Sequence, residues 1–467
     1  MSSRAPQRPF GLRDKLGYLF GDFGNDFTFI LSTMILMKFY TDVMGVAAGV
    51  VGTVMMLARI VDGVTDVTFG RLCDRGRVTR HGKFKPWLLR MCVPVALSSF
   101  LIYQSGLASA PYSLRVAWLA LTYILWGSVF YTAVNIPYGS MASAISREPD
   151  DRQSLSTFRT MGGMLAGMVI GVALPLIAYE KNEAGLDVIV GKRVTAVAGV
   201  FSLLAVVCYL LCYALVTERV VPRAEAHPQK SVGAMLRDAA GNRALLSIIA
   251  ASVVMLLAQL TMQNMAAYIY PDYYKSAVAQ SVSTVMMLVA MSAAAAVTKP
   301  LARRFGKAEV SAFSNLFAVL VNLVLFIIRP ADVWVYVGFQ TLSWLGLGVF
   351  SMVSWALITD VIDDAELRTG VREDGTVYAL YSFARKLGQA VSAGLTGWLL
   401  GAIGYDSAAA AAGLGQTEAV LGGIFGISVL VPALGFGLLA AVLWFWYPLH
   451  KRQVDANVAA LKKKHGH

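Results

Sequence analysis

The sequence predicts an all-α membrane protein with twelve transmembrane helices in two bundles of six. Of its 467 residues, 57% are hydrophobic and 15% are charged, and the mean hydropathy is +0.61. A water-soluble protein of this length needs a larger share of polar residues to cover its core. Apolar runs of about twenty residues recur along the chain, and each can cross a bilayer as a helix. Barrel strands would need only about ten residues of alternating polarity, so helices are predicted.

Loop signals separate the twelve apolar spans in order along the chain. The first span contains Asp22 and Asp26, and no cleavage site of small residues follows it. We therefore expect it to remain as a membrane helix and not to be a signal peptide. The predicted spans cover residues 16–41, 46–70, 87–108, 114–145, 155–179, 195–216, 243–271, 279–300, 309–328, 333–360, 376–403 and 419–447.

The distribution of basic residues predicts the orientation in the membrane. The formal net charge is +12, and Lys and Arg gather in alternate loops, whereas the loops at 41–49 and 404–418 have none. The positive-inside rule then places both termini in the cytoplasm and requires an even number of spans. This pattern indicates a multi-pass protein of the plasma membrane, the inner membrane of a bacterium, and argues against a nucleic-acid partner.

A long polar stretch near the middle of the chain predicts two halves. It covers 218–242 and separates a bundle at 1–217 from a bundle at 243–447, which a cytoplasmic tail at 448–467 follows. A weak internal repeat supports this division, because the basic turn 70–83 after the second span has an echo at 299–307 after the eighth. Two related six-helix bundles around a central cavity are the arrangement of the major facilitator fold.

Charged residues inside the spans are the first functional signal. Each costs roughly 2.5–3.5 kcal/mol at the centre of a membrane helix, so it needs a partner or water. Arg59, Asp62 and Asp66 share one helical face by their spacing of three and four, and so do Asp22 and Asp26. Because two carboxylates exceed one guanidinium, Asp62 and Asp66 are predicted to bind a monovalent cation or a proton. The alternative is a structural ion pair with Arg59.

Other polar residues at membrane depth suggest a solute site. Arg159 and Lys386 are interpreted either as counter-charges or as direct solute contacts. Tyr131, Thr132 and Asn135 offer hydrogen-bonding groups along one face of the fourth span. Pro137 and Gly139 are expected to loosen that helix, and a merely kinked helix is the alternative.

Several motifs together resemble the glycoside-pentoside-hexuronide:cation symporters, a branch of the major facilitator superfamily that includes the melibiose permease. The resemblance covers nearly the whole chain. It is carried by the segments 18–26 (YLFGDFGND), 40–42 (YTD), 58–66 (ARIVDGVTD), 81–87 (HGKFKPW), 135–138 (NIPY), 359–363 (TDVID) and 381–389 (YSFARKLGQ).

The resemblance implies roles for particular residues. Asp62 and Asp66 match the family's cation-binding carboxylates, with Thr132 contributing and Thr65 beside them. The solute site is predicted to include Asp22, Asp26, Tyr131, Asn135, Arg159, Ser382 and Lys386. The cytoplasmic gating networks are predicted to include Asp74, Arg75, Arg80, Lys83, Asp360, Asp363 and Glu366.

Two departures from the melibiose permease affect these predictions. Thr65 stands where that permease has an asparagine ligand for Na⁺, which raises the case for H⁺ coupling. Asn135 stands where it has a sugar-binding aspartate, and Gly139 where it has a tryptophan. The loss of an acid near Arg159 would leave the cavity more positive, which favours a uronide.

The resemblance implies symport of a sugar, glycoside or uronide with Na⁺ or H⁺ (Li⁺ being a further option) by alternating access, in a protein that works as a monomer. No cofactor is expected, and no metal other than Na⁺ at Asp62 and Asp66. An enzyme is not predicted, because no His or Cys constellation lies at membrane depth. The alternatives are a lysolipid-like or other non-sugar solute, and a membrane sensor that binds a sugar without transporting it.

Overall fold

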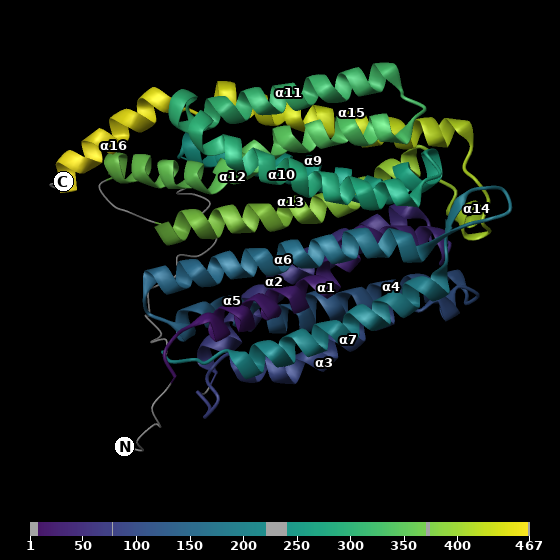
Figure 1. Ribbon diagram of the computed structural model, residues 1–467, viewed down its shortest axis with the longest axis horizontal. Helices are drawn as coiled ribbons and strands as arrows, with labels where there is room; N and C mark the ends of the chain where they lie inside the picture. Colours follow the sequence, from purple (N-terminus) through teal and green to yellow (C-terminus); the bar gives the residue numbers. More distant parts are fainter. Residues whose placement is uncertain (1–7, 77, 221–240, 370–373, 466–467) are drawn as a thin grey trace. The chain divides into compact units, whose positions relative to one another are not determined.

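The computed structural model describes residues 8–76, 78–220, 241–369 and 374–465. The described chain is almost entirely helical (Figure 1). It divides into two compact units, of which the first contains Met1–Ala226 with Tyr405–Gln416 and the second contains His227–Gly404 with Thr417–His467. Most of the predicted linker at 218–242 lies outside the described residues.

The first unit is built around α1, which packs against α6 and α7, while α2 packs against α4, η2 and α5. A two-stranded antiparallel hairpin follows α6, with Tyr179 paired to Ile189. The elements are α1 (Leu12–Asp42), α2 (Ala48–Arg75), α3 (Lys85–Ile102), η1 (Ser105–Leu107), α4 (Tyr112–Ile124), the π-helical turn η2 (Leu125–Tyr131), α5 (Thr132–Ile145), α6 (Pro149–Ala178), β1 (Tyr179–Lys181), β2 (Asp187–Ile189), α7 (Gly191–Leu215) and α14 (Ser407–Ala411).

In the second unit, α9 packs against α13 and α15, and α11 packs against α12 and α15. Its buried core is aliphatic and aromatic, with Phe350, Leu357 and Phe436 fully enclosed. The elements are α9 (Arg243–Tyr268), η3 (Ile269–Tyr273), α10 (Ala277–Phe305), α11 (Lys307–Ile328), α12 (Val333–Thr369), α13 (Asp374–Ala402), α15 (Glu418–Ala441), η4 (Val442–Trp446) and α16 (Lys451–His465).

Each predicted span coincides with a helix, alone or continued by a short 3-10 or π-helical turn, and the span 114–145 covers α4, η2 and α5. Ten of these helices, counted over the described residues, are long and apolar enough to cross a membrane. The other two, α1 and α13, have 31 and 29 residues but carry the charges that the sequence singles out. The number of twelve spans therefore stays a prediction.

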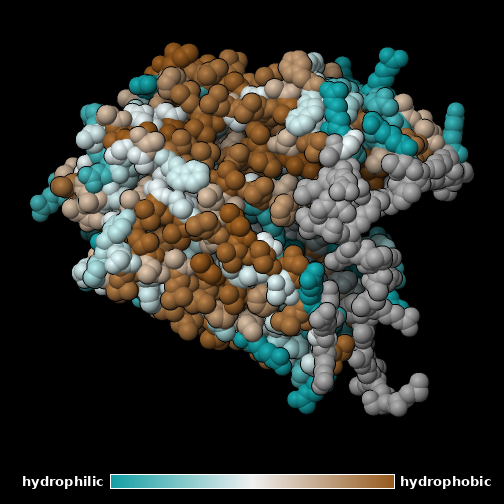
Figure 2. Space-filling view, turned by 180° about the vertical axis from the view of Figure 1, so that it is seen from behind, coloured by the Kyte–Doolittle hydropathy of each residue, from teal (hydrophilic) through white to brown (hydrophobic). Residues whose placement is uncertain are grey.

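The outer faces of the helices are hydrophobic. Figure 2 shows broad apolar areas on the molecular surface, with hydrophilic side chains concentrated towards its margins. Val64 on α2, Ile327 on α11 and Leu434 on α15 are 68%, 78% and 67% exposed. Contiguous apolar surface of this kind is unfavourable in water and favourable against lipid tails. The surface therefore agrees with a membrane protein.

Residues 405–416 pack within the first unit, although they connect α13 to α15. A buried cluster holds this segment to the end of α1. Lys38 Nζ lies 2.7 Å from Asp42 Oδ2 and donates to the Tyr405 hydroxyl at 3.1 Å, and that hydroxyl donates to Asp42 Oδ1 at 2.8 Å. Further along, Asn182 Nδ2 donates to the Gly413 carbonyl at 2.9 Å.

Candidate functional site

The first carboxylate of the α2 face, Asp62, is held by two partners. Arg59 Nη1, one turn earlier, lies 3.2 Å from Asp62 Oδ2. The Ser128 hydroxyl, which η2 supplies, donates to the other oxygen, Oδ1. Both oxygens of Asp62 are therefore engaged inside the protein. This geometry agrees with the ion-pair alternative for Asp62, and its role as a cation ligand stays a prediction.

The second carboxylate, Asp66, meets a hydroxyl from the neighbouring helix. The Thr132 hydroxyl at the start of α5 lies 3.1 Å from Asp66 Oδ1 and 3.2 Å from the Gly127 carbonyl, so its single proton is shared between them. The predicted pair of Asp66 and Thr132 is therefore brought together. Thr65 instead donates its hydroxyl to backbone carbonyls of its own helix, including that of Asp62 at 3.1 Å.

The π-helical turn η2 brings both hydroxyls to α2. It contains Ser128 and ends one residue before Thr132, so one of the two side chains that reach the carboxylates lies within this turn and the other directly follows it. A π-helical turn widens the helix and leaves backbone carbonyls available for other contacts, and such turns are frequent at functional sites. Pro137 and Gly139 both lie within α5, which continues past them to Ile145, and the expected loosening there stays a prediction.

Aromatic rings enclose the guanidinium of Arg59. Its Cζ lies 5.2 Å from the centroid of the Phe29 ring on α1 and 5.8 Å from that of Tyr123 on α4. Phe29 in turn stacks on Tyr131 of η2, with centroids 5.6 Å apart. Contacts of this kind favour a cation over the ring face. Phe29 of α1 thus lies between Tyr131, which is predicted as a solute ligand, and the guanidinium of Arg59.

A second polar cluster lies between α1 and α6. Arg159 Nε donates to Asp22 Oδ1 at 3.0 Å, and the guanidinium lies 5.2 Å from the centroid of the Tyr138 ring. Gly163 on α6 lies against both α1 carboxylates. A Cβ at this position would lie 2.7 Å from Asp26 Oδ2 and 3.2 Å from Asp22 Oδ2. The structure therefore brings together three predicted solute-site residues, and Gly163 makes their close approach to α6 sterically feasible.

The pairing of Asp22 changes the charge argument about the solute. The sequence suggests that the loss of an acid at Asn135, near Arg159, leaves the cavity more positive, which would favour a uronide. In the structure Asp22 supplies a carboxylate to Arg159 from α1. Asp22 thus offsets the charge of Arg159, which weakens the case for a uronide, and the preference for a uronide stays a prediction.

The predicted solute residues of the second half lie on α13 in the second unit. Ser382 and Lys386 are four residues apart, and both are exposed. Arg385 lies over two rings, with its Cζ 5.9 Å from the Trp355 centroid and 5.8 Å from the Tyr381 centroid. Arg385 therefore contacts aromatic rings of both α12 and α13. The roles of Ser382 and Lys386 in solute binding stay predictions.

The predicted gate of the first half is described only in part. The side chains of Asp74 and Arg75 lie outside the described part of the structure. Arg80 is exposed, and its Nε donates to His81 Nε2 at 3.0 Å. Lys83 is buried, and its backbone N–H donates to Glu218 Oε2 at 2.6 Å.

The predicted gate of the second half contains a short ion pair. Lys307 Nζ at the start of α11 lies 2.6 and 2.8 Å from the two carboxylate oxygens of Asp360 on α12. Asp363 is half-buried and Glu366 is buried on the same helix. The pair links two helices of one unit, and its gating role stays a prediction.

Glu218 is a structural residue that sequence reasoning missed, because it falls in the predicted linker. Its carboxylate accepts the backbone N–H groups of Lys83, Phe84 and Lys85 at 2.6, 2.9 and 2.7 Å. These groups begin α3, where unpaired N–H donors and the helix dipole favour an anion. Gly82 has a left-handed φ of +115°, and a Cβ there would lie 2.5 Å from Cδ of Glu218.

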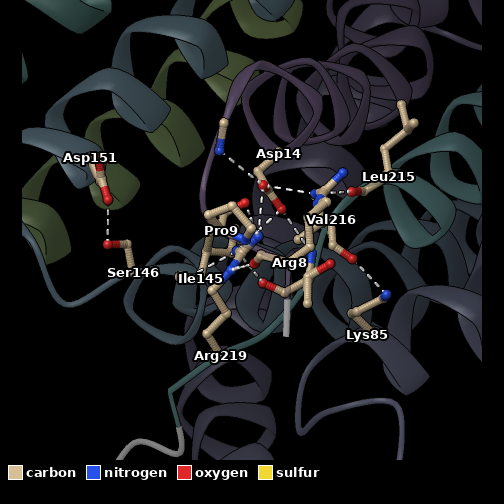
Figure 3. A network of polar contacts seen from close by, with 12 residues as sticks. Arg8, Pro9, Asp14, Lys85, Ile145, Ser146, Asp151, Leu215, Val216 and Arg219 are labelled. Atoms are coloured by element: carbon tan, nitrogen blue, oxygen red, sulfur yellow. Dashed lines mark hydrogen bonds and ion pairs between the residues drawn. The ribbon is translucent and has the colours of Figure 1, made fainter. Parts of the chain in front are cut away.

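A second missed cluster surrounds Asp14, which is fully buried (Figure 3). Arg8 Nη2 and Arg219 Nη2 lie 2.8 and 2.9 Å from Asp14 Oδ2, and the Thr217 N–H donates to Oδ1 at 3.0 Å. One carboxylate thus ties the N-terminal segment to the chain that leaves α7. Asp14 lies just before the predicted first span, and two of its partners, Thr217 and Arg219, lie about two hundred residues further along the chain.

The oxygen atoms around Asp62 and Asp66 limit which ions the α2 cluster can bind. The carboxylates of Asp62 and Asp66 and the hydroxyls of Ser128 and Thr132 are hard oxygen ligands of the kind that alkali cations take. A carboxylate of this kind could equally hold a proton. The geometry of the α2 cluster is thus compatible with either ion.

Comparisons with known proteins identify relatives over almost the whole chain. Residues 17–451 match the MFS/sugar transport protein family. The chain is 31% identical to the glucuronide carrier protein homolog of Escherichia coli (strain K12), covering 97% of this chain and 96% of that protein. It is 30% identical to the isoprimeverose transporter of Lactiplantibacillus pentosus, covering 97% and 91%. A bacterial homologue of the human lysosomal transporter Spinster has a similar fold, with a TM-score of 0.68 at 11% identity over 96% and 99% of the chains.

Proposed function

Because the chain belongs to the MFS/sugar transport protein family and is a membrane transporter rather than an enzyme, we propose that it carries a glycoside or uronide by symport with a cation. Its fold is the major facilitator fold, which confirms the prediction from the sequence. We further propose that the coupling ion is Na⁺ or H⁺, that both termini lie in the cytoplasm, and that the protein works as a monomer.

The contact between Asp66 and Thr132 carries the proposal of cation coupling. It joins a carboxylate of α2 to a hydroxyl of α5 at 3.1 Å, beside the pair of Asp62 with Arg59 and Ser128. Arg59 offsets one of the two carboxylate charges of this α2 cluster. A small cation or proton bound between the two carboxylates would reduce their mutual repulsion and the cost of enclosing them in a dry interior.

A ring contact supports coupling between the α2 cluster and the solute. Phe29 lies on α1, seven residues after Asp22, and its ring contacts both the Arg59 guanidinium and the Tyr131 ring. Binding of a cation at Asp66 would change the field at Arg59, and the rings provide a packed path from there to α1. By linkage, the cation raises the affinity for the solute by the same factor by which the solute raises that for the cation.

The cluster of Asp22, Asp26 and Arg159 supports a hydroxyl-rich solute. Charged acceptors and a guanidinium can bind several sugar hydroxyls at once. Arg159 already has a carboxylate partner, so its charge is less available to a uronide. We therefore propose a neutral glycoside as the preferred solute and a uronide as its competitor. Of the two relatives, one is named as a glucuronide carrier homolog, which is the uronide class, and the other as an isoprimeverose transporter, which is the glycoside class.

The test is uptake into proteoliposomes across a panel of neutral glycosides and uronides, each with Na⁺, with Li⁺ or with a pH step. The proposal expects one solute class to be concentrated only when one of these gradients is present. Asp22→Asn frees Arg159 and should shift the preference towards uronides by about tenfold, because one buried charge contact changes partner. Solute uptake that no cation gradient accelerates would contradict symport, and an unchanged preference would contradict the assignment of Asp22.

A further inference from the structure

A pocket of about 540 Å³ lies in the second unit, where α10 ends, α11 begins and α16 packs against α11 and α12. Four basic and two acidic side chains line it: Lys299, Arg303, Lys307, Lys451, Asp360 and Asp455. Much of the remaining wall is apolar and includes Ala295, Val353 and Leu449. The described lining residues therefore carry an excess of positive charge beside an apolar surface.

The basic side chains of the pocket differ in what they contact. Lys307 forms the ion pair with Asp360, which offsets its charge. Lys451 Nζ donates to the backbone carbonyls of Arg303 and Arg304 at 2.6 and 3.2 Å, so neutral partners fix it in place. Lys299 and Arg303 are exposed, and their spacing of four puts them on one face of α10.

Two hydrogen bonds hold the wall that α16 provides in place. Asn457 Nδ2 donates to Asp364 Oδ1 at 3.1 Å, and the Lys451 N–H donates to Glu309 Oε1 at 2.8 Å. Gly306 makes the turn between α10 and α11 with a left-handed φ of +105°, and a Cβ there would collide with the Glu309 carboxylate. The N–H groups of the first turn of α11 add positive potential at this end of the helix.

We propose that this pocket binds a phosphate-type anion: the headgroup of an anionic phospholipid or free phosphate. Guanidinium and ammonium groups bind phosphate oxygens by charge-assisted hydrogen bonds, and basic pockets at the cytoplasmic ends of membrane helices suit lipid headgroups. Phe305 and Met352, which are 52% and 43% exposed, offer apolar surface on α10 and α12 near the pocket. Neither the solute nor the coupling ion of the proposed function has a role in this inference.

The test compares two double variants of the full-length protein that lose the same charge. Lys299→Ala with Arg303→Ala empties the pocket of two cations, whereas Arg304→Ala with Arg452→Ala removes two exposed cations that do not line it. Native mass spectrometry would measure retention of phosphatidylglycerol against phosphatidylcholine, and thermal unfolding would measure stabilisation by inorganic phosphate. We expect the pocket variant to bind about 30-fold more weakly, since each basic residue near an anionic headgroup contributes about 1 kcal/mol, and the matched variant to bind as the parent protein does.

A third variant should strengthen binding, which a folding defect cannot imitate. Asp455→Asn removes an exposed carboxylate from the pocket wall and should tighten anion binding about fivefold by the same reasoning. If the pocket variant loses binding of phosphatidylglycerol alone, the ligand is a lipid headgroup. If it loses stabilisation by inorganic phosphate alone, the ligand is a free anion. Equal losses in the two double variants, or no anion binding by the parent protein, would overturn the proposal.

Discussion

Replacing Thr132 by valine tests how the hydroxyl of α5 serves the carboxylate of α2. Valine keeps the shape of the side chain and removes the donor that lies 3.1 Å from Asp66 Oδ1. A hydrogen bond to a charged group contributes about 1.5–3 kcal/mol. Because the proton is shared with the Gly127 carbonyl at 3.2 Å, the lower end of that range applies. The expected change is therefore about tenfold in the affinity of the site for its cation.

The direction of the change depends on the ion. If Na⁺ is the coupling ion, the lost oxygen ligand raises the Na⁺ concentration for half-maximal uptake about tenfold. If H⁺ is the coupling ion, the carboxylate without its donor holds a proton more tightly, so the midpoint of the pH profile moves up by about one unit. Uptake by Thr132→Val, measured at a series of Na⁺ concentrations and pH values, separates these cases. Thr132→Ser keeps the hydroxyl and serves as the control. A cation dependence that valine leaves unchanged would refute the reasoning.

Two other substitutions follow from close contacts in the first unit. Gly163→Ala places a Cβ 2.7 Å from Asp26 Oδ2, so the carboxylate must move, and we expect the KM for the solute to rise about tenfold at equal expression. Lys38→Met leaves the carboxylate of Asp42 buried without its cation, and we expect the free energy of unfolding to fall by about 3 kcal/mol, as thermal unfolding of the purified protein would measure.

Each of these substitutions has a matched control on the same unit. Gly167→Ala adds the same methyl group one turn along α6, where its nearest neighbour would be Ile30 Cδ1 at an ordinary 3.5 Å. Lys192→Met removes an exposed charge instead of a buried one. A KM that responds equally to both alanines, or equal unfolding free energies for the two methionine variants, would contradict the roles given to Gly163 and Lys38.

Helix positions were predictable because hydrophobic runs and loop signals are local properties of the sequence. The same holds for residues that share a helical face, such as Asp62 with Asp66. The contact of Asp66 with Thr132 also follows the expected motif. These predictions depend on spacing within a helix or on a family pattern, and neither needs knowledge of long-range packing.

Long-range partners were not predictable from spacing. Asp22 and Arg159 are 137 residues apart, and only the packing of α1 on α6 brings them together. Ser128, which donates to Asp62, lies in the π-helical turn η2. The sequence Leu-Trp-Gly-Ser does not predict a turn of this kind. Composition places Glu218 in the linker, yet its carboxylate accepts backbone N–H groups at the start of α3. In each case a polar residue forms a hydrogen bond or ion pair with a group that the local sequence does not identify.

Accumulation and exchange by Asp66→Asn test the central claim most directly, because they separate coupling from movement of the solute. Purified parent and variant proteins would be reconstituted, and solute uptake driven by a cation gradient would be compared with counterflow in preloaded vesicles. The account predicts that the variant loses accumulation and keeps counterflow, since an uncharged amide no longer requires a cation before the carrier can reorient. Accumulation by the variant at the parent level would contradict the account.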